Sequence, residues 1–331
     1  MNTDSKIRLG VVGAGQISSH HIKAALDNGF VLDSICAKDN SHRAQLLGSE
    51  FGFRKSCKTF EDFLNQEVDA YLVLTNTNVQ VLIAHKLLSK EKPILIEKPV
   101  SLNPLEIKSL READVNDNVV VGYNRRNYSS TKKLKSILND LPTYAFQVNV
   151  PELASNANPK SKVIEQMILE NSVHIFDLVF FLFGRPNSWK VRALNSDSNV
   201  FVRYVDWDYV NSRAGSMFVS IGVPDNWSIS VYAPGNRFVL SPLEVFTHYS
   251  EIELVAANSK RPNRLYVPKT SQAWSPDEVD VRLKAGFHSQ MKDFRNFILS
   301  RSRPETLASL SECEFVTSFA QEVLAGESHH H

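Results

Sequence analysis

Short apolar runs alternate with longer amphipathic segments over the first third of the chain. The short runs are continuous and rich in β-branched residues, as expected for strands that are buried on both faces. The longer segments repeat apolar residues at helical spacing. The predicted strands are 7–12, 31–37, 70–74, 94–97 and 119–122, and the predicted helices are 17–26, 41–51, 79–88 and 105–113. This alternation predicts βαβ units and a doubly wound parallel sheet of the Rossmann type.

The pattern changes after Gly122. Turn residues separate several strand-like runs between 188 and 254, which predicts an antiparallel sheet. The predicted elements are helices at 129–138, 167–183, 287–299 and 310–324, strands at 144–150, 217–221, 228–232 and 237–240, and a polar loop at 151–161. We therefore expect an α/β protein with a dinucleotide-binding domain over 1–123 and a second α/β domain, for substrate binding and oligomerisation, over 124–328.

Charge and cysteine content narrow the possible partners. The formal net charge of the 331 residues is +1, which favours neither nucleic acid nor an anionic membrane as a partner. Cys36, Cys57 and Cys313 are scattered without zinc-type spacing, so we expect reduced thiols in a cytoplasmic protein and no metal site. No signal peptide or membrane-spanning run is apparent. Residues 329–331 are histidines and are interpreted as a tag remnant.

A glycine-rich turn follows the first predicted strand and precedes the first predicted helix. In Gly13-Ala14-Gly15-Gln16-Ile17-Ser18, Gly13 permits the tight turn and Gly15 allows the backbone to approach a pyrophosphate. Ser18 supplies a small residue where the third glycine of such motifs usually stands. The strand–turn–helix context favours dinucleotide binding over a plain glycine turn, with Gly13, Gly15, Gln16 and Ile17 as cofactor contacts.

The end of the second predicted strand bears on the choice between NAD and NADP. An acid here would hold the ribose hydroxyls of NAD, but the position is Ala37, followed by Lys38. Asp33 falls too early in the strand to do this. Ala37 and Lys38 therefore favour NADP, the alternative being that Lys38 is an ordinary solvated lysine.

Two further segments make the sequence more specific. They are Ile94-Leu95-Ile96-Glu97-Lys98-Pro99 and Gly122-Tyr123-Asn124-Arg125-Arg126, each at the end of a predicted strand. In order and spacing, these segments and the glycine turn resemble the Gfo/Idh/MocA family of NAD(P)-dependent sugar and polyol oxidoreductases, over nearly the whole chain. The resemblance implies an open, mostly antiparallel sheet in the second domain.

The same resemblance assigns the catalytic candidates. It places Lys98 beside the nicotinamide and the reacting hydroxyl, and His174 at the position of the family's catalytic histidine. Relatives often have a cis bond before the proline of the Glu-Lys-Pro segment. The chain departs from the common family pattern at Glu170, which is usually aspartate, and at Ser172, which is usually glycine. It departs again at 75–78, where Thr75, Asn76 and Asn78 are expected next to the nicotinamide ribose.

Alcohol oxidation needs a proton acceptor and a positive group at one oxygen, because hydride leaves as the proton is removed. Lys98 and His174 supply both, and we favour His174 as the acceptor. Without the surrounding motifs, Lys98 would be interpreted as a surface lysine and His174 as a histidine of the core. Glu97 and Lys98 are expected among the cofactor contacts, and Glu97 is also expected to shape the lysine turn or to form a structural ion pair. The remaining substrate candidates are Tyr123, Asn124, Arg126, Glu170 and Asp177. The alternative for Arg126 is that it joins the two domains, and the alternative for Asp177 is that it pairs with a surface lysine.

We expect an enzyme that transfers hydride between a nicotinamide cofactor and a hydroxyl or keto carbon of a sugar, nucleotide sugar or cyclic polyol. The alternatives are an NAD-dependent glycoside hydrolase and a non-catalytic dinucleotide-binding regulator. Apolar residues on the outer face of an open sheet would favour a homodimer or homotetramer.

Overall fold

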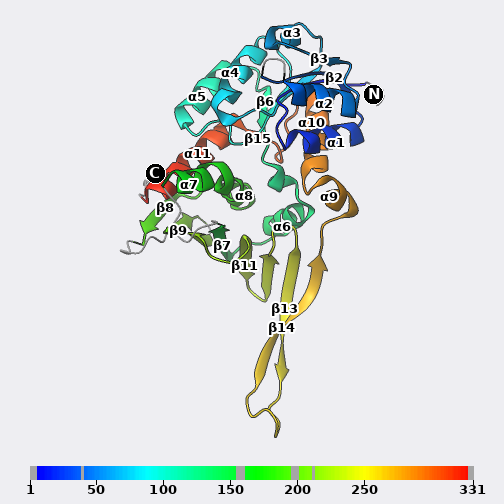
Figure 1. The fold of residues 1–331 in the computed structure, drawn as a ribbon. Coiled ribbons are helices and arrows are strands. Elements are labelled where there is room, and N and C mark those ends of the chain that lie inside the picture. The colour runs from blue at the N-terminus through cyan, green and yellow to red at the C-terminus, as the bar shows by residue number, and fades with distance from the viewer. Residues whose placement is uncertain (1–5, 39–40, 154–160, 195–200, 211–212, 327–331) are drawn as a thin grey trace. The chain divides into compact units, whose positions relative to one another are not determined.

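The structure is a computed structural model that describes residues 6–38, 41–153, 161–194, 201–210 and 213–326. The chain forms two compact units (Figure 1), one made of 1–127 and 278–319, the other of 128–277 and 320–331. This division differs from the boundary expected at 123/124, because the segment 278–319 returns to the first unit. The histidines at 329–331 lie outside the described residues.

The first unit contains a seven-stranded sheet in the order β15-β6-β5-β4-β1-β2-β3. All neighbours are parallel except β15, which pairs antiparallel with β6. The strands are β1 (Arg8–Val12), β2 (Val31–Cys36), β3 (Lys55–Ser56), β4 (Ala70–Val73), β5 (Ile94–Ile96), β6 (Val119–Val121) and β15 (Ala308–Ser309). The predicted Rossmann-type sheet is confirmed, with the short β3 and β15 in addition.

The helices of this unit connect these strands or follow them. They are α1 (Ser18–Asp27), α2 (His42–Phe51), α3 (Phe60–Leu64), α4 (Thr77–Leu88), α5 (Pro104–Ala113), the 3₁₀ helix η1 (Asn124–Asn127), α9 (Glu278–Leu283) and α10 (Phe287–Ser300). The last helix, α11 (Leu310–Ala325), has residues in both units.

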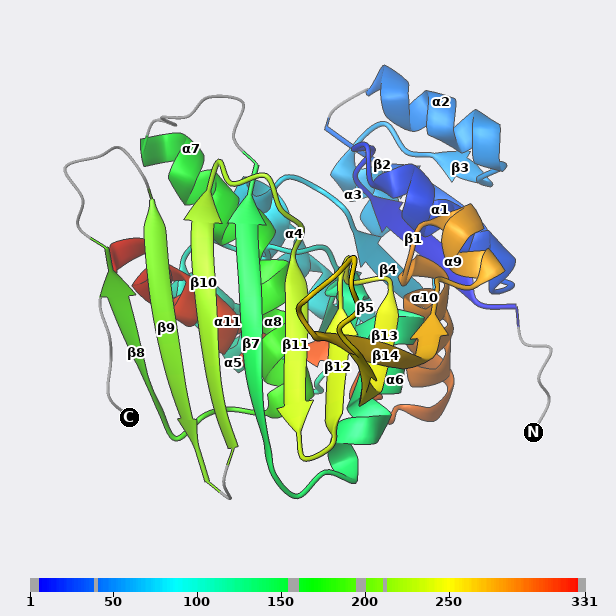
Figure 2. The same cartoon turned by 90° about the horizontal axis from the view of Figure 1, so that it is seen from below.

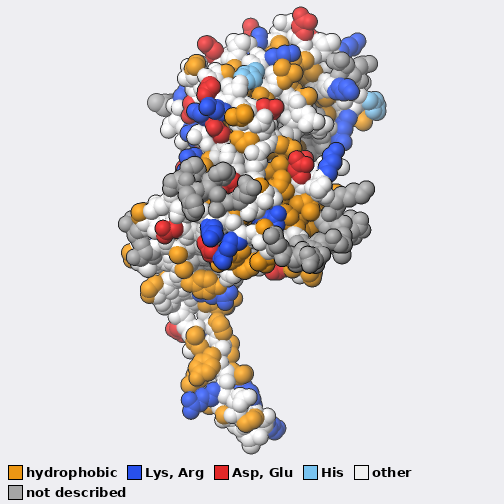
Figure 3. Space-filling view, turned by 90° about the vertical axis from the view of Figure 1, so that its left-hand side faces the viewer, with side chains coloured by type: hydrophobic (Ala, Val, Ile, Leu, Met, Phe, Trp, Pro, Cys, Tyr) orange, Lys and Arg blue, Asp and Glu red, His pale blue; other side chains and the backbone are white. Residues whose placement is uncertain are grey.

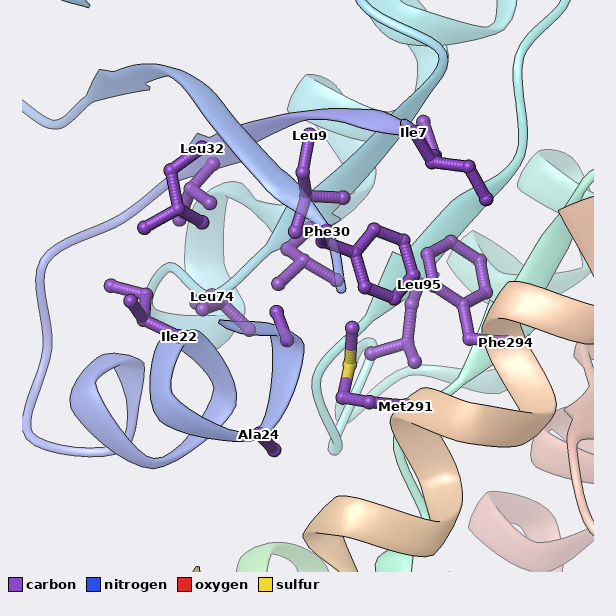
Figure 4. Packing of buried hydrophobic residues seen from close by; sticks show 14 of the residues in the cluster. Ile7, Leu9, Ile22, Ala24, Phe30, Leu32, Leu74, Leu95, Met291 and Phe294 are labelled. Atoms are coloured by element: carbon purple, nitrogen blue, oxygen red, sulfur yellow. The ribbon is translucent and has the colours of Figure 1, made fainter. Parts of the chain in front are cut away.

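The core of the first unit includes a helix from the C-terminal segment. Figure 4 shows Met291 and Phe294 of α10 beside Leu9, Phe30 and Leu95 from the sheet region. The rings of Phe30 and Phe294 stack with centroids 6.4 Å apart. Because α10 buries apolar side chains against the sheet, residues far from the N-terminus are part of the Rossmann core.

The chain order reverses across β1. From β1 the chain proceeds to β2 and β3 on one side, and then crosses to β4 on the other side of β1. Ligands of doubly wound sheets bind at this switch point, outside the carboxyl ends of the strands. The loops that follow β1 and β4 therefore flank the expected ligand position.

The second unit contains an eight-stranded sheet in the order β14-β13-β12-β11-β7-β10-β9-β8 (Figure 2), in which β7 and β10 are parallel and all other neighbours antiparallel. The mostly antiparallel sheet implied by the family resemblance is confirmed. The strands are β7 (Tyr144–Glu152), β8 (Ser188–Ala193), β9 (Val202–Tyr209), β10 (Arg213–Ile221), β11 (Ser228–Ala233), β12 (Asn236–Leu240), β13 (Phe246–Val255) and β14 (Leu265–Trp274).

Helices pack on one face of this sheet. They are α6 (Ser129–Asn139), α7 (Ser161–Gln166), the π-helical segment η2 (Met167–Ser172) and α8 (Val173–Phe183). Phe146 of β7 stacks on Phe183 of α8, with ring centroids 3.7 Å apart. The predicted helix at 167–183 thus begins six residues earlier, at Ser161, and its first predicted turns are π-helical.

The continuous helical stretch 161–183 is apolar enough, by length and composition, to cross a membrane. The sequence reading, which sought an uninterrupted apolar run, did not register it as such. In the structure, 78% of its most apolar window is buried inside the protein. Burial against the sheet accounts for its hydropathy, as in the core helix of a globular domain.

The hairpin β13–β14 extends beyond the other strands as an arm (Figures 1 and 3). Every residue of β14 is exposed. Hydrophobic side chains lie along the arm, and Lys and Arg side chains lie near its tip (Figure 3). The sequence reading missed β14 because Pro268 argues against a strand, but β14 is an edge strand, where proline is tolerated.

Candidate active site

The glycine turn closes tightly against the loop that follows β4. Gly13 has a φ of +113°, and a Cβ atom there would lie 2.3 Å from the carbonyl oxygen of Leu74. Its N–H donates to the carbonyl of Cys36 over 2.7 Å. Only glycine fits this position, because a side chain would be strained and would overlap backbone. The loops after β1 and β4 are thereby in contact at the switch point.

Gly15 is different, and its surroundings fit a dinucleotide. A Cβ atom on Gly15 would meet only the Leu74 carbonyl, at an ordinary 3.8 Å, so packing within the chain does not require glycine. Helix α1 starts two residues after Gln16 without a side-chain cap and without an acidic residue in its first turn. An uncapped helix N-terminus beside open backbone is the arrangement that binds a pyrophosphate.

Ser18 takes the place of a third glycine. It is fully buried, and its hydroxyl donates to the carbonyl of Gly13 over 3.3 Å. The hydroxyl is therefore satisfied inside the turn, and Ser18 holds the shape of the loop. Gln16 and Ile17 form the remaining turn before α1 and stay candidates for cofactor contact.

Thr75 and Asn76 lie in the loop after β4, and Asn78 is the second residue of α4. Asn76 is the N-cap residue of α4, although its side chain makes no capping hydrogen bond. Asn76 and Asn78 are exposed, and Thr75 is half-buried. All three lie at the carboxyl edge of the sheet, beside the glycine turn, where the sequence predicted them.

Among the described residues at the end of β2, which stop at Lys38, no acid is free to hold a ribose. Asp33 is 2% exposed, and its carboxylate accepts two hydrogen bonds from Arg54, at 2.9 and 3.0 Å. This carboxylate raises the pKa of the Arg54 guanidinium through its hydrogen bonds and charge. Asp33 is thus committed to an ion pair. Ala37 is half-buried and Lys38 exposed at the strand end.

The turn after β5 presents Lys98, which is half-buried. The preceding Glu97 is buried, and both of its carboxylate oxygens accept hydrogen bonds. Oε1 pairs with Nε2 of His21 at 2.6 Å, and Oε2 accepts the backbone N–H of Lys98 at 2.9 Å. The peptide bond between Lys98 and Pro99 is cis, as the family resemblance implied. Glu97 therefore acts inside the turn that carries Lys98.

Helix α4 supplies a second contact to this turn. Gln80 is 1% exposed, and its side-chain amide donates to the carbonyls of Thr75 and Pro99, each over 3.2 Å. The sequence reading missed both His21 and Gln80. Their roles were not predictable, because their partners lie far away in the sequence.

Three residues after β6 were predicted to contact substrate. They are buried, and they form hydrogen bonds to other residues of the first unit. The hydroxyl of Tyr123 lies 3.6 Å from the sulfur of Cys313, and the Asn124 amide donates to the carbonyl of Ala285. Arg126 is 1% exposed and donates to Glu312 at 2.8 Å and to the carbonyl of Glu305.

We therefore interpret Tyr123, Asn124 and Arg126 as structural residues. They join the N-terminal part of the first unit to the returning segment 278–319. Sequence alone suggested a joining role for the arginines, but between the two domains; for Arg126 the contacts lie inside one unit. Their role as substrate contacts stays a prediction.

The second unit holds the predicted histidine. His174 is half-buried in the first turn of α8, and Asp177 is fully buried one turn later, so Asp177 is not a surface charge. Glu170 is half-buried in η2. Single π-helical segments occur frequently at functional sites, because they re-aim side chains within a helix.

A buried carboxylate holds this π-helical segment. Glu152, at the end of β7, accepts hydrogen bonds from the amide of Asn171 and from the hydroxyl of Ser172. Ser172 is fully buried. The serine in place of the family's common glycine is thus used by the fold, and Glu152 is a site-shaping residue that the sequence reading missed.

Comparison with known proteins decides the family. Residues 7–125 match the family model described as the Gfo/Idh/MocA oxidoreductase family with an NAD-binding Rossmann fold. The Rossmann domain over these residues is thus similar to that of the Gfo/Idh/MocA family. The matched segment contains the glycine turn and the Glu97-Lys98-Pro99 turn. The predicted family and the predicted NAD(P)-dependent oxidoreductase activity are confirmed.

Individual relatives support the assignment over more of the chain. The myo-inositol 2-dehydrogenase of Thermotoga maritima is 24% identical over 259 residues, which cover 72% of both chains. A dehydrogenase structure from Chromobacterium violaceum matches with a TM-score of 0.79 at 18% identity, covering 98% of this chain and 96% of that one. A levoglucosan dehydrogenase in complex with NADH and levoglucosan gives 0.75 at 14% identity, with 97% coverage of each. At these identities the structural matches show the fold.

Proposed function

We propose that this protein oxidises a ring hydroxyl of a cyclic polyol or sugar, with Lys98 and His174 acting on the same oxygen. The observation that carries the proposal is the Glu97-Lys98-Pro99 turn. It lies at the carboxyl edge of the sheet that bears the dinucleotide loops, and buried groups hold it in place. A lysine fixed beside a nicotinamide site suits the polarisation of a reacting hydroxyl.

The two side chains have separate roles. The nicotinamide, when bound, supplies the hydride acceptor. The ammonium of Lys98 stabilises negative charge on the substrate oxygen, and the imidazole of His174 accepts its proton, since histidine titrates near neutral pH. Lys98 belongs to the first unit and His174 to the second.

The relatives suggest which substrates to test first. One is named a myo-inositol 2-dehydrogenase and another an inositol 2-dehydrogenase from Leifsonia xyli, 25% identical over 193 residues. We propose a cyclic polyol of the inositol type. Purified protein should reduce NAD or NADP with one or more inositols, in a screen that also contains free sugars and nucleotide sugars. No reduction with any polyol or sugar would refute the proposed reaction.

Dinucleotide binding is tested at Gly15. A valine at this position should abolish binding while the fold is kept, because Cβ fits and the added methyl groups fill the space above the turn. Binding is measured by titration with NAD and NADP, and folding by thermal unfolding. Equal affinity in wild type and Gly15→Val would show that the cofactor lies elsewhere.

The cofactor preference rests on the end of β2. We propose that NADP is the preferred cofactor. The Asp33 carboxylate forms an ion pair with Arg54, and Lys38, next to Ala37, is exposed and can therefore pair with the 2′-phosphate of NADP. Lys38→Ala should weaken NADP binding by about fivefold, the scale of one exposed charge pair, and leave NAD unchanged. Tighter binding of NAD than of NADP by the wild type would contradict this preference.

Two other functions were weighed from the sequence. An NAD-dependent glycoside hydrolase would release a sugar without net formation of NAD(P)H, and a regulator would bind dinucleotide without turnover. Net NAD(P)H formation from a free polyol excludes both.

We also propose that the outer face of the second sheet joins copies of the chain, since Phe218 and Tyr232 are exposed there.

A further inference from the structure

The backbone on each side of Lys98 is linked to a buried side chain of a different helix, on one side through Glu97 and on the other directly. Before the lysine, Glu97 accepts the Lys98 N–H and pairs with His21 of α1. After the lysine, Gln80 of α4 donates to the carbonyl of Pro99. A backbone held at both ends has few positions available to the side chain between them.

The contact before the lysine is buried. His21 is fully buried, and Nε2 lies 2.6 Å from Oε1 of Glu97. The ring of His21 also packs edge-on against Phe287, with centroids 4.8 Å apart. With the ring fixed by Phe287, His21 sets where the Glu97 carboxylate lies, and Oε2 of that carboxylate sets the Lys98 N–H.

The contact after the lysine links two loops. The Gln80 amide donates to Thr75 in the loop after β4 and to Pro99 in the lysine turn, at equal distances of 3.2 Å. One amide group thus spaces the two loops. Gln80 is buried, so water cannot easily replace its two hydrogen bonds, and their loss would leave buried polar groups unpaired.

Both helices begin at loops that flank the dinucleotide site. Helix α1 follows the glycine turn, and α4 follows the loop with Thr75. Each helix reaches the lysine turn about one turn after its first residue. We propose that His21 and Gln80 are positioning residues that fix Lys98 relative to the two cofactor loops. This inference rests on the proposed role of Lys98.

The test measures the effect of each residue with and without Lys98. Gln80→Leu should lower kcat with an inositol substrate by about tenfold, while KM and dinucleotide affinity change by less than about twofold, because a misplaced group lowers turnover without weakening binding. In a Lys98→Ala background the same substitution should change kcat by less than about twofold, because the group that it positions is gone. His21→Phe should behave in the same way.

A matched control is available in the same unit. Gln290 is a fully buried glutamine of α10 for which neither side-chain polar atom has a hydrogen-bond partner among the described residues. Gln290→Leu makes the same chemical change and should leave kcat within about twofold of wild type. Thermal unfolding of all variants separates loss of fold from loss of positioning.

A rescue variant covers the case in which His21→Phe fails to fold. His21→Gln keeps an N–H donor for Glu97 and should restore kcat to within about threefold of wild type. Amide hydrogen exchange of the peptide that contains Lys98 should be faster in His21→Phe than in His21→Gln, since the Lys98 N–H loses a fixed acceptor.

Three results would overturn the inference. They are an equal kcat loss for Gln80→Leu in both backgrounds, an equal loss for Gln290→Leu, and unchanged exchange at Lys98 in His21→Phe. A Lys98→Ala variant with wild-type turnover would instead refute the proposed function. The two failures are therefore distinguishable.

Discussion

The two candidate catalytic side chains are held by buried carboxylates that work in different ways. In the first unit, Glu97 accepts the backbone N–H of Lys98. In the second unit, the Glu152 carboxylate accepts hydrogen bonds from the side chains of Asn171 and Ser172. A backbone N–H is present whatever residue stands there, but a hydroxyl or amide is not. The segment before His174 therefore depends on the identity of its own residues, whereas the lysine turn depends mainly on Glu97.

Removal of Glu152 should have the largest effect on stability. Glu152→Ala leaves the buried hydroxyl of Ser172 and the amide of Asn171 without their acceptor, and should lower the free energy of unfolding by about 3 kcal/mol. Glu152→Gln keeps an acceptor oxygen and should lose less. Chemical unfolding measures both variants. A loss below about 1 kcal/mol for Glu152→Ala would mean that the carboxylate does not hold η2.

Arg126 tests how side-chain hydrogen bonds hold the returning segment 278–319 in the first unit. Arg126→Met removes donors to Glu305 and Glu312 and should lower the free energy of unfolding by about 2 kcal/mol, less than a fully buried pair, because Glu312 is 37% exposed. The KM for substrate should stay within about twofold. A large increase in KM with unchanged stability would restore the substrate role that the structure argues against.

The same pair predicts an acid-side dependence of stability. Burial acts to raise the pKa of Glu312, but Arg126 and the hydrogen bonds from Ser309 outweigh it, so the pKa lies below its ordinary value. A lowered native-state pKa stabilises the fold above the ordinary glutamate pKa, and this stability is lost as the pH falls through the lowered pKa. Unfolding measured along an acid series should show a shallower loss in Arg126→Met than in wild type.

A substitution at Ser172 should have the smallest effect on the free energy of unfolding. It compares a side-chain donor with the backbone donor at Lys98 directly. Ser172→Ala removes one hydrogen bond to Glu152 and should cost about 1 kcal/mol of unfolding free energy. Ala substitution of Lys98, whose backbone N–H remains, should cost less. If Lys98→Ala destabilises the protein more than Ser172→Ala does, the distinction between backbone and side-chain anchoring fails.

The first unit was more predictable from sequence than the second. Its strands are buried on both faces, so they appear in the sequence as continuous apolar runs. Its glycine turn has a geometry that requires glycine at position 13, so the sequence predicts the turn as well. In the second unit, β14 was missed because Pro268 argues against a strand, and η2 because helical spacing does not distinguish π from α turns. The structure of β14 depends on its place at the edge of the sheet, and the structure of η2 depends on its packing against the sheet.

The catalytic candidates were predictable, but the residues that hold them were not. Lys98 follows a motif, whereas its partners His21 and Gln80 lie on helices distant from it in sequence. Arg126 shows a related limit, because its place at a strand end suggested either a ligand contact or a joining role, and Glu312, one of its partners, lies in the distant returning segment 278–319. Long-range pairing, which sequence spacing does not encode, accounts for both.

The most direct test of shared catalysis by Lys98 and His174 is a double-mutant cycle on kcat/KM with an inositol substrate. Lys98→Ala and His174→Ala should each lower kcat/KM by about a hundredfold or more, the scale expected for a positioned acid–base group. The double variant should be little worse than the more damaged single variant, because both groups serve one proton transfer. A double variant whose loss equals the product of the single losses would contradict a shared hydroxyl, and wild-type turnover in His174→Ala would remove the histidine from the mechanism.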